Sequence, residues 1–81
     1  PTLNQTRFTA QSQQDGRQLA LWMETTTPDF ETYEVRIDGG PWQPTDRQWN
    51  WSLRDGMNRA EMRTRNRSGI TGVISALSVV A

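Results

Sequence analysis

The sequence predicts an all-β fold, a seven-stranded antiparallel β-sandwich, from three observations. Turn-forming Gly, Pro, Asp and Asn residues recur so often that the runs between them are too short for typical helices. Within those runs apolar and polar residues alternate. Because successive side chains of a strand point to opposite faces, such a run has one buried face and one solvent-exposed face. Six clear runs and one short run give roughly seven strands, a number typical of a sandwich of two sheets.

Each expected strand is bounded by turn signals. The alternating runs occupy residues 7–10, 19–23, 33–37, 49–53, 60–64 and 73–80, and a short strand is expected around Trp42 and Gln43. Arginine and glutamate also favour a helix over 59–67, but that segment is too short to be a stable helix. We expect one domain over 5–81, preceded by a linker over 1–4. Its core is expected to contain Leu21, Val35, Trp51 and Met62.

The composition excludes several kinds of chemistry. The chain has 81 residues, a formal net charge of zero, no cysteine and no histidine. Disulfides, thiolate chemistry, Cys/His zinc sites and a histidine-based catalytic triad are therefore ruled out. The nine basic residues, all arginines, are balanced by nine carboxylates, which argues against a nucleic-acid partner. No apolar run approaches the length of a membrane span. We expect a monomer without cofactor, metal ion or membrane insertion.

Four short motifs follow one another in an informative order. They are Leu19-Ala20-Leu21-Trp22, Tyr33-Glu34-Val35, Leu53 shortly before Gly56, and Asn66-Arg67-Ser68-Gly69. This order resembles the fibronectin type III pattern over most of the chain. The segments 33–42 and 51–58 look still closer to bacterial variants of that fold, which are attached to secreted or cell-surface enzymes. The resemblance implies a fibronectin type III-like, non-catalytic accessory or spacer module of a larger secreted or cell-surface protein, with neighbouring domains or a polysaccharide as partners.

Two positions depart from the family pattern. Where the family usually places a corner tyrosine, the chain runs Gly56-Met57-Asn58-Arg59, and we expect Asn58 to replace it through an Asx-type bond to the backbone. The second departure is Trp22. If Leu19, Leu21 and Met23 face the core, Trp22 points away from it. The family tryptophan, by contrast, is a core residue. A one-residue slip or a bulge would reverse this.

The four tryptophans divide into two pairs. Trp49 and Trp51 share the parity of Leu53, so they are expected to fill the core. Trp42 and Trp22 are the better candidates for contact with a ligand or a neighbouring domain, Trp42 first. Exposed indole rings also stack on the apolar faces of sugars, so a carbohydrate-binding module is the alternative function.

Arginines occur at alternate positions near the end of the chain. Arg59, Arg63, Arg65 and Arg67 line one face together with Glu61 if their strand is unbroken. Arg63 and Arg65 could then bind an anionic polysaccharide through bidentate contacts. The competing interpretation is local. In a fibronectin-like sheet the strand 33–37 lies alongside, and its outward residues are Glu34, Arg36 and Asp38, so cross-strand ion pairing would neutralise much of the row.

Other polar groups carry weaker signals. Asp29, Glu31 and Glu34 lie close in sequence, but a sandwich of this size has no room for the deep pocket that acid/base catalysis requires, so no catalytic residue is assigned. Asp29/Glu31 and Asp38 lack the spacing of a calcium loop. The triplets beginning at Asn4, Asn50 and Asn66 fit the N-glycosylation pattern, although asparagine in turns has a backbone role of its own.

Overall fold

The computed structural model describes residues 6–12, 17–27 and 30–81. Its strands are β1 (Arg7–Ser12), β2 (Gln18–Glu24), β3 (Phe30–Ile37), β4 (Gln43–Thr45), β5 (Gln48–Ser52), β6 (Met57–Asn66) and β7 (Ser75–Val80). Each expected run overlaps a strand, although β5 ends before Leu53 and β7 begins two residues after Val73, and the all-β prediction is confirmed. The segment where a helix was the alternative, 59–67, lies in β6 except for Arg67, which follows the strand. The described ranges contain no helix long and apolar enough to cross a membrane. The expected linker over 1–4 lies outside the described residues.

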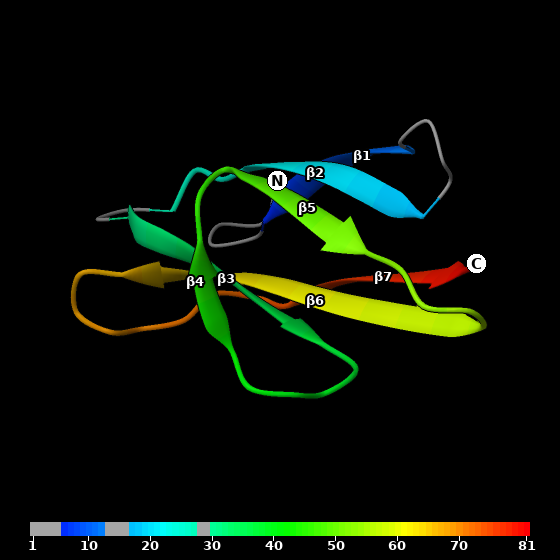
Figure 1. The fold of residues 1–81 in the computed structure, drawn as a ribbon. Helices are drawn as coiled ribbons and strands as arrows, with labels where there is room; N and C mark the ends of the chain where they lie inside the picture. Colours follow the sequence, from blue (N-terminus) through cyan, green and yellow to red (C-terminus); the bar gives the residue numbers. More distant parts are fainter. Residues whose placement is uncertain (1–5, 13–16, 28–29) are drawn as a thin grey trace.

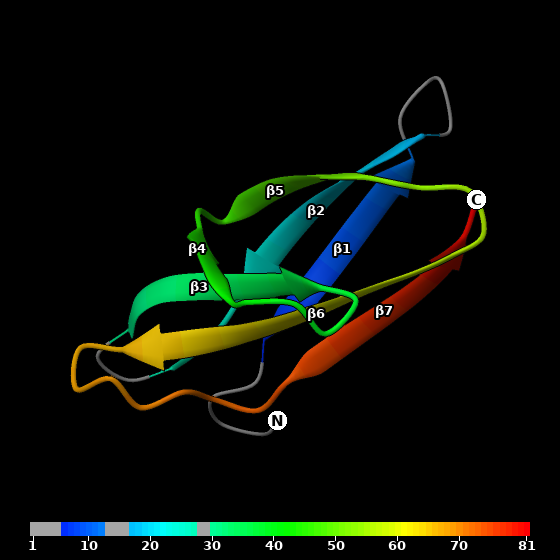
Figure 2. The ribbon, with the colours of Figure 1, turned by 60° about the horizontal axis from the view of Figure 1, so that its bottom comes forward.

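Two antiparallel sheets lie face to face (Figure 1). One has three strands in the order β1-β2-β5, and the other has four in the order β4-β3-β6-β7. The expected neighbours β3 and β6 pair along most of their length, from Phe30 opposite Asn66 to Ile37 opposite Ala60. Figure 2 shows β1 and β7 on the same side of the molecule, where the open edges of the two sheets meet.

The core lies between the sheets and forms because alternate residues point inward. The four residues expected at its centre, Leu21, Val35, Trp51 and Met62, are all buried. They belong to two clusters, one around Val35 and Met62 and the other around Leu21 and Trp51. Phe8, Trp49 and Leu77 pack against both clusters and join them. Trp49 is therefore a core residue, but it is only partly buried, and its ring stacks on that of Trp51 at 5.9 Å.

The register of β2 decides the position of Trp22. Leu19, Leu21 and Trp22 pair with Trp51, Trp49 and Gln48 of β5 in an unbroken series, so β2 has neither a slip nor a bulge there. Leu21 and Met23 are buried, whereas Trp22 lies between them in sequence and is partly exposed. Trp22 therefore faces outward, as the alternation predicts and unlike the core tryptophan of the family pattern.

A tight turn follows β3. Asp38 and Gly39 both have positive φ, 51° and 75°, and the amide of Gly40 donates to the carbonyl of Ile37 at 2.9 Å. Positive φ at both central positions defines a type I′ turn, for which Asp-Gly is a preferred pair. The turn sends the chain back along β3. Trp42 immediately precedes β4 and does not lie within it, which corrects the expected strand at Trp42 and Gln43 by one residue.

Candidate functional site

Trp42 lies against two arginines on the outer face of the four-stranded sheet. The guanidinium carbon of Arg63 is 4.0 Å from the centre of the Trp42 ring, and that of Arg36 is 4.6 Å away. Both distances are within the range of a cation–π interaction. Arg36 projects from β3 and Arg63 from β6, so the ring, which belongs to the loop before β4, spans both strands. Trp42 is half-buried there.

Each of these arginines also pairs with a carboxylate directly across the sheet. Arg36 lies opposite Glu61 and donates to both of its oxygens, at 3.0 and 3.3 Å. Arg63 lies opposite Glu34 and donates at 2.9 Å. The hydrogen bond from Arg36 holds the pKa of Glu61 below its ordinary value, against a smaller opposing effect of burial. We call Trp42, Arg36, Arg63, Glu34 and Glu61 the Trp42 cluster.

Arg65 extends the row of ion pairs. The pairing of β3 with β6 shifts between Phe30 and Thr32, so Glu31 is an extra residue at a bulge. Arg65 donates to Glu31 at 2.9 Å and lies 3.8 Å from Glu34. The predicted pairing of Arg63 and Arg65 with β3 is thus confirmed. Arg67 does not join the row, because β6 ends at Asn66 and Arg67 lies exposed in the following turn.

Asp38 was expected to pair with the arginine row but has a different partner. Its carboxylate accepts a hydrogen bond from the guanidinium of Arg54, in the loop after β5. It also accepts the backbone N–H of Arg59 at 3.1 Å. The type I′ turn brings Asp38 beyond the end of β3, where the first residues of β6 and the β5–β6 loop are within reach. This correction depends on turn geometry, which the alternation of the strand does not encode.

Trp22 lies on the outer face of the other sheet, so it cannot form one platform with Trp42. It borders a shallow cavity of about 200 Å³, lined also by Arg7, Phe8, Thr9 and Glu24. Glu24 is in turn 3.5 Å from Arg47. The cavity combines an indole ring with charged and hydroxyl groups.

Two of the remaining polar candidates, Asn58 and Asn66, have structural roles. Asn58 is fully buried and bonds to the backbone, as expected. The side-chain oxygen of Asn66 accepts the amides of Ser68 and Ile70, at 2.9 and 3.0 Å, and so holds the turn after β6. Asn50 is exposed on β5, whereas Asn4 and Asp29 lie outside the described residues.

The Trp42 cluster was only partly predictable from the sequence. Trp42, Arg63 and the pairing of β3 with β6 were expected, but the docking of Trp42 onto Arg36 and Arg63 was not. Alternation along β3 does place Arg36 and Glu34 on the outer face, and that was the available signal. No three His, Cys, Asp or Glu residues gather as possible metal ligands within the described part of the chain. No protein-family model matches the chain, and searches of curated proteins and of solved structures found no match either.

Proposed function

We propose that this chain is a fibronectin type III-like accessory module of a larger secreted or cell-surface protein. In this proposal it acts without catalysis, as a rigid spacer that docks a neighbouring domain of the same polypeptide. The docking surface is the Trp42 cluster. The observation that carries the proposal is the half-buried Trp42 ring held against two arginines on an outward-facing sheet.

The strand order supports the fibronectin type III-like assignment over a constant-type immunoglobulin fold. In the constant-type fold the fourth strand joins the sheet of the first, second and fifth strands. Here the fourth strand, β4, joins β3, β6 and β7. The motif order in the sequence and the pairing of β3 with β6 are in keeping with this assignment.

The chemistry of the Trp42 cluster supports a protein partner. Tryptophan and arginine are the residues most enriched at binding hot spots, because each offers a large contact area with a polar handle. The ion pairs to Glu61 and Glu34 fix both guanidinium groups before any partner arrives. A surface whose side chains are already held loses little conformational entropy on binding. Glu34 and Glu31 neutralise Arg63 and Arg65, which argues against an anionic polysaccharide as the ligand.

Calorimetry of the parent polypeptide tests the docking role. A docked neighbour unfolds together with this domain, so we expect one cooperative transition in the parent protein. Trp42→Ala should separate it into two transitions, and Trp22→Ala, on the opposite face, should not. A single unchanged transition in the Trp42→Ala protein would contradict docking through this cluster.

A carbohydrate-binding module is the second candidate, and the cavity beside Trp22 favours it. An indole ring next to hydroxyl and charged groups is a suitable combination for one sugar ring. Affinity electrophoresis in gels containing soluble xylan or hydroxyethylcellulose separates the two proposals. Retardation that disappears with Trp22→Ala and persists with Trp42→Ala would favour sugar binding. Equal mobility with and without polysaccharide would leave only the docking role.

A further inference from the structure

Strand β7 forms an open edge of the four-stranded sheet. It pairs with β6 on one side and is the last strand in the sheet order. Natural sheets protect such edges with short strands, prolines or charged residues. β4, the opposite edge, has only three residues and contains Pro44, and β1 begins with Arg7. β7 has six residues, and the chain from Ile70 to Ala81 contains neither charge nor proline.

The exposed apolar side chains gather at this edge. The described residues include six large apolar side chains that are exposed. Four of them, Ile70, Val73, Ile74 and Val80, belong to β7 or to the segment leading into it. A fifth, Met57, lies directly opposite Val80 on β6. Such a concentration of apolar surface marks a contact site for another protein surface.

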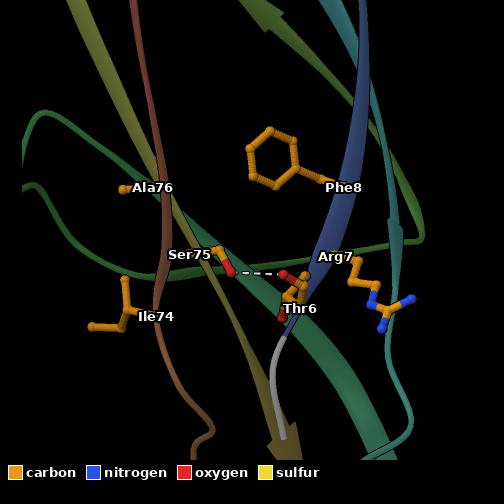
Figure 3. Close-up of a pocket in the computed structure, with 6 residues that line it drawn as sticks. All are labelled: Thr6, Arg7, Phe8, Ile74, Ser75 and Ala76. Atoms are coloured by element: carbon orange, nitrogen blue, oxygen red, sulfur yellow. Dashed lines mark hydrogen bonds between the residues drawn. The ribbon is translucent and has the colours of Figure 1, made fainter. Parts of the chain in front are cut away.

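Figure 3 shows which face these residues occupy. The Ser75 hydroxyl points toward β1 and donates to the carbonyl of Thr6 at 2.6 Å, at a cavity of about 520 Å³ between the two strands. Ile74 and Ala76 point the other way, to the outer face of the sheet (Figure 3). By alternation, Ser78 and Val80 share that outer face with Ile74 and Ala76.

We infer that β7 is a self-association site, at which a second copy of this chain adds its own β7 antiparallel to the first. The two-fold axis passes beside Leu77, so that Val80 lies opposite the partner's Ile74 and Ser78 opposite the partner's Ala76. The two four-stranded sheets then continue into each other. The contact is isologous and closes at two copies, because each β7 edge is used once.

The apolar residues select this register. Met57, Val80 and the partner's Ile74 fall in one row across three adjacent strands. Their exposed fractions in the single chain are 62%, 71% and 45%. Directly opposed side chains in a sheet are close enough to exclude water from one another. The two-fold axis produces this row twice, so six exposed apolar side chains are covered by one contact.

The charges select the same register. Arg59 lies opposite Ser78, and Glu61 lies opposite Ala76. In the proposed pairing, Arg59, Ser78, the partner's Ala76 and the partner's Glu61 form one row, with small side chains between opposite charges. Sliding one strand by two residues in one direction would put Arg59 in the same row as the partner's Arg59. Sliding it in the other direction would put Glu61 in the same row as the partner's Glu61. Either register would therefore bring like charges into one row. A slip of one residue would send the two copies' side chains to opposite faces.

The expected contact is small. Two edges of six residues with their flanking side chains fall in the class of weak interfaces, below about 1,200 Å². The protein is then monomeric when dilute, in keeping with the sequence-based expectation, and dimeric when concentrated.

Sedimentation equilibrium over a range of protein concentrations tests the site. We expect reversible dimerisation in the wild type and a dissociation constant at least about tenfold weaker in Val80→Lys, because a lysine at a strand edge opposes pairing. Ser78→Lys provides a second variant at an exposed position, and equal unfolding midpoints show that both variants are folded. Asn50→Lys places the same charge at an exposed position on β5, the edge of the other sheet that lies away from β7, and should leave dimerisation unchanged. A protein that stays monomeric at every concentration, or that dimerises equally well with Val80→Lys, would overturn the inference.

Two further comparisons test the register. Arg59→Glu should weaken the dimer, whereas Arg67→Glu, the same charge change in the exposed turn, should not. Because the chain lacks cysteine, Ala76→Cys and Ser78→Cys introduce single thiols. With oxidised glutathione as the oxidant, an equimolar mixture of the two variants should form disulfide-linked dimers faster than either alone. Each variant alone places its thiols diagonally, about 7 to 8 Å apart. Equal rates in all three samples, or equal effects of the two glutamate substitutions, would overturn this pairing.

Discussion

The side-chain amide of Asn58 pairs with both backbone groups of Arg54, four residues earlier. Its oxygen accepts the N–H of Arg54 at 2.8 Å, and its nitrogen donates to the Arg54 carbonyl at 2.8 Å. The same nitrogen reaches the carbonyl of Gly56 at 3.0 Å and that of Val79, on β7, at 3.4 Å. One buried side chain thus closes the β5–β6 loop and ties it to the neighbouring strand.

Asn58→Ala should therefore destabilise the fold strongly. Removing the amide leaves the N–H of Arg54 and several carbonyls without their partner, and unsatisfied buried polar groups are costly. We expect a loss of about 2 to 4 kcal/mol in the free energy of unfolding, measured by urea denaturation. Asn50→Ala, at an exposed position on β5, should cost less than about 0.5 kcal/mol. Similar losses of stability in the two variants would show that the bonds of Asn58 to the β5–β6 loop do not stabilise the fold.

Trp51 should be the most sensitive aromatic position. It is buried among Leu21, Ala60 and Trp49, and Trp51→Ala should cost about 3 to 5 kcal/mol, enough to abolish folding of a small domain. The indole N–H has no hydrogen-bond partner in the described part of the chain, so Trp51→Phe loses no hydrogen bond. We expect Trp51→Phe to remain folded with a lower urea midpoint. A loss below about 1 kcal/mol in Trp51→Ala would place this face outside the core.

Tyr33 should make stability fall at alkaline pH. Its buried hydroxyl donates to the carbonyl of Met23 on the other sheet at 3.3 Å, and desolvation raises its pKa, offset in part by Arg47. The folded state then keeps the phenol proton at a pH where the unfolded chain has lost it. The stabilisation is complete below about pH 10, the ordinary value, and is lost as the pH rises through the folded pKa.

The chain allows a clean measurement of this effect. It has one tyrosine and no lysine, so no other side chain titrates near pH 10. We expect the free energy of unfolding to decrease between about pH 10 and pH 12 in the wild type and to be nearly flat in Tyr33→Phe. Absorbance of the tyrosinate in the folded protein gives the pKa directly. A pKa at or below the ordinary value would contradict the prediction.

Glu61 should titrate below its ordinary range because of Arg36. In Arg36→Gln, the pKa of Glu61 should rise toward the ordinary value, since the two hydrogen bonds from the guanidinium are lost. Carboxyl-detected NMR titration measures the shift. For the wild type, a lowered pKa means a contribution to stability that is present above the unfolded pKa and fades as the pH falls through the folded one. Arg54→Gln, which removes the partner of Asp38, should leave the Glu61 titration unchanged.

Local patterns carried much of the information about the interior. The two-residue period alone identified the inward face of β2, β3, β5 and β6, because side-chain direction along a strand depends only on position. It favoured an outward Trp22, but a slip or a bulge stayed possible until the register of β2 excluded it. The bonds of Asn58 to the backbone were predictable for a similar reason, since Asx-type bonds involve residues close in sequence. Pairing of Arg63 with Glu34 required one further assumption, that β3 and β6 are neighbours.

The features that alternation did not determine depend on turn geometry and on contacts between distant segments. Alternation shows which side chains face outward, but the docking of Trp42 on Arg36 and Arg63 follows from the type I′ turn after Ile37, which folds the loop over the sheet. The partner of Asp38 and the end of β6 before Arg67 depend on turn geometry in the same way. Alternation indicated the face of most strand residues, because side-chain direction is a local property of an extended backbone. Sheet order, register and the open β7 edge were decided by the tertiary structure, because packing and hydrogen bonding between strands far apart in the chain determine which edges remain unpaired.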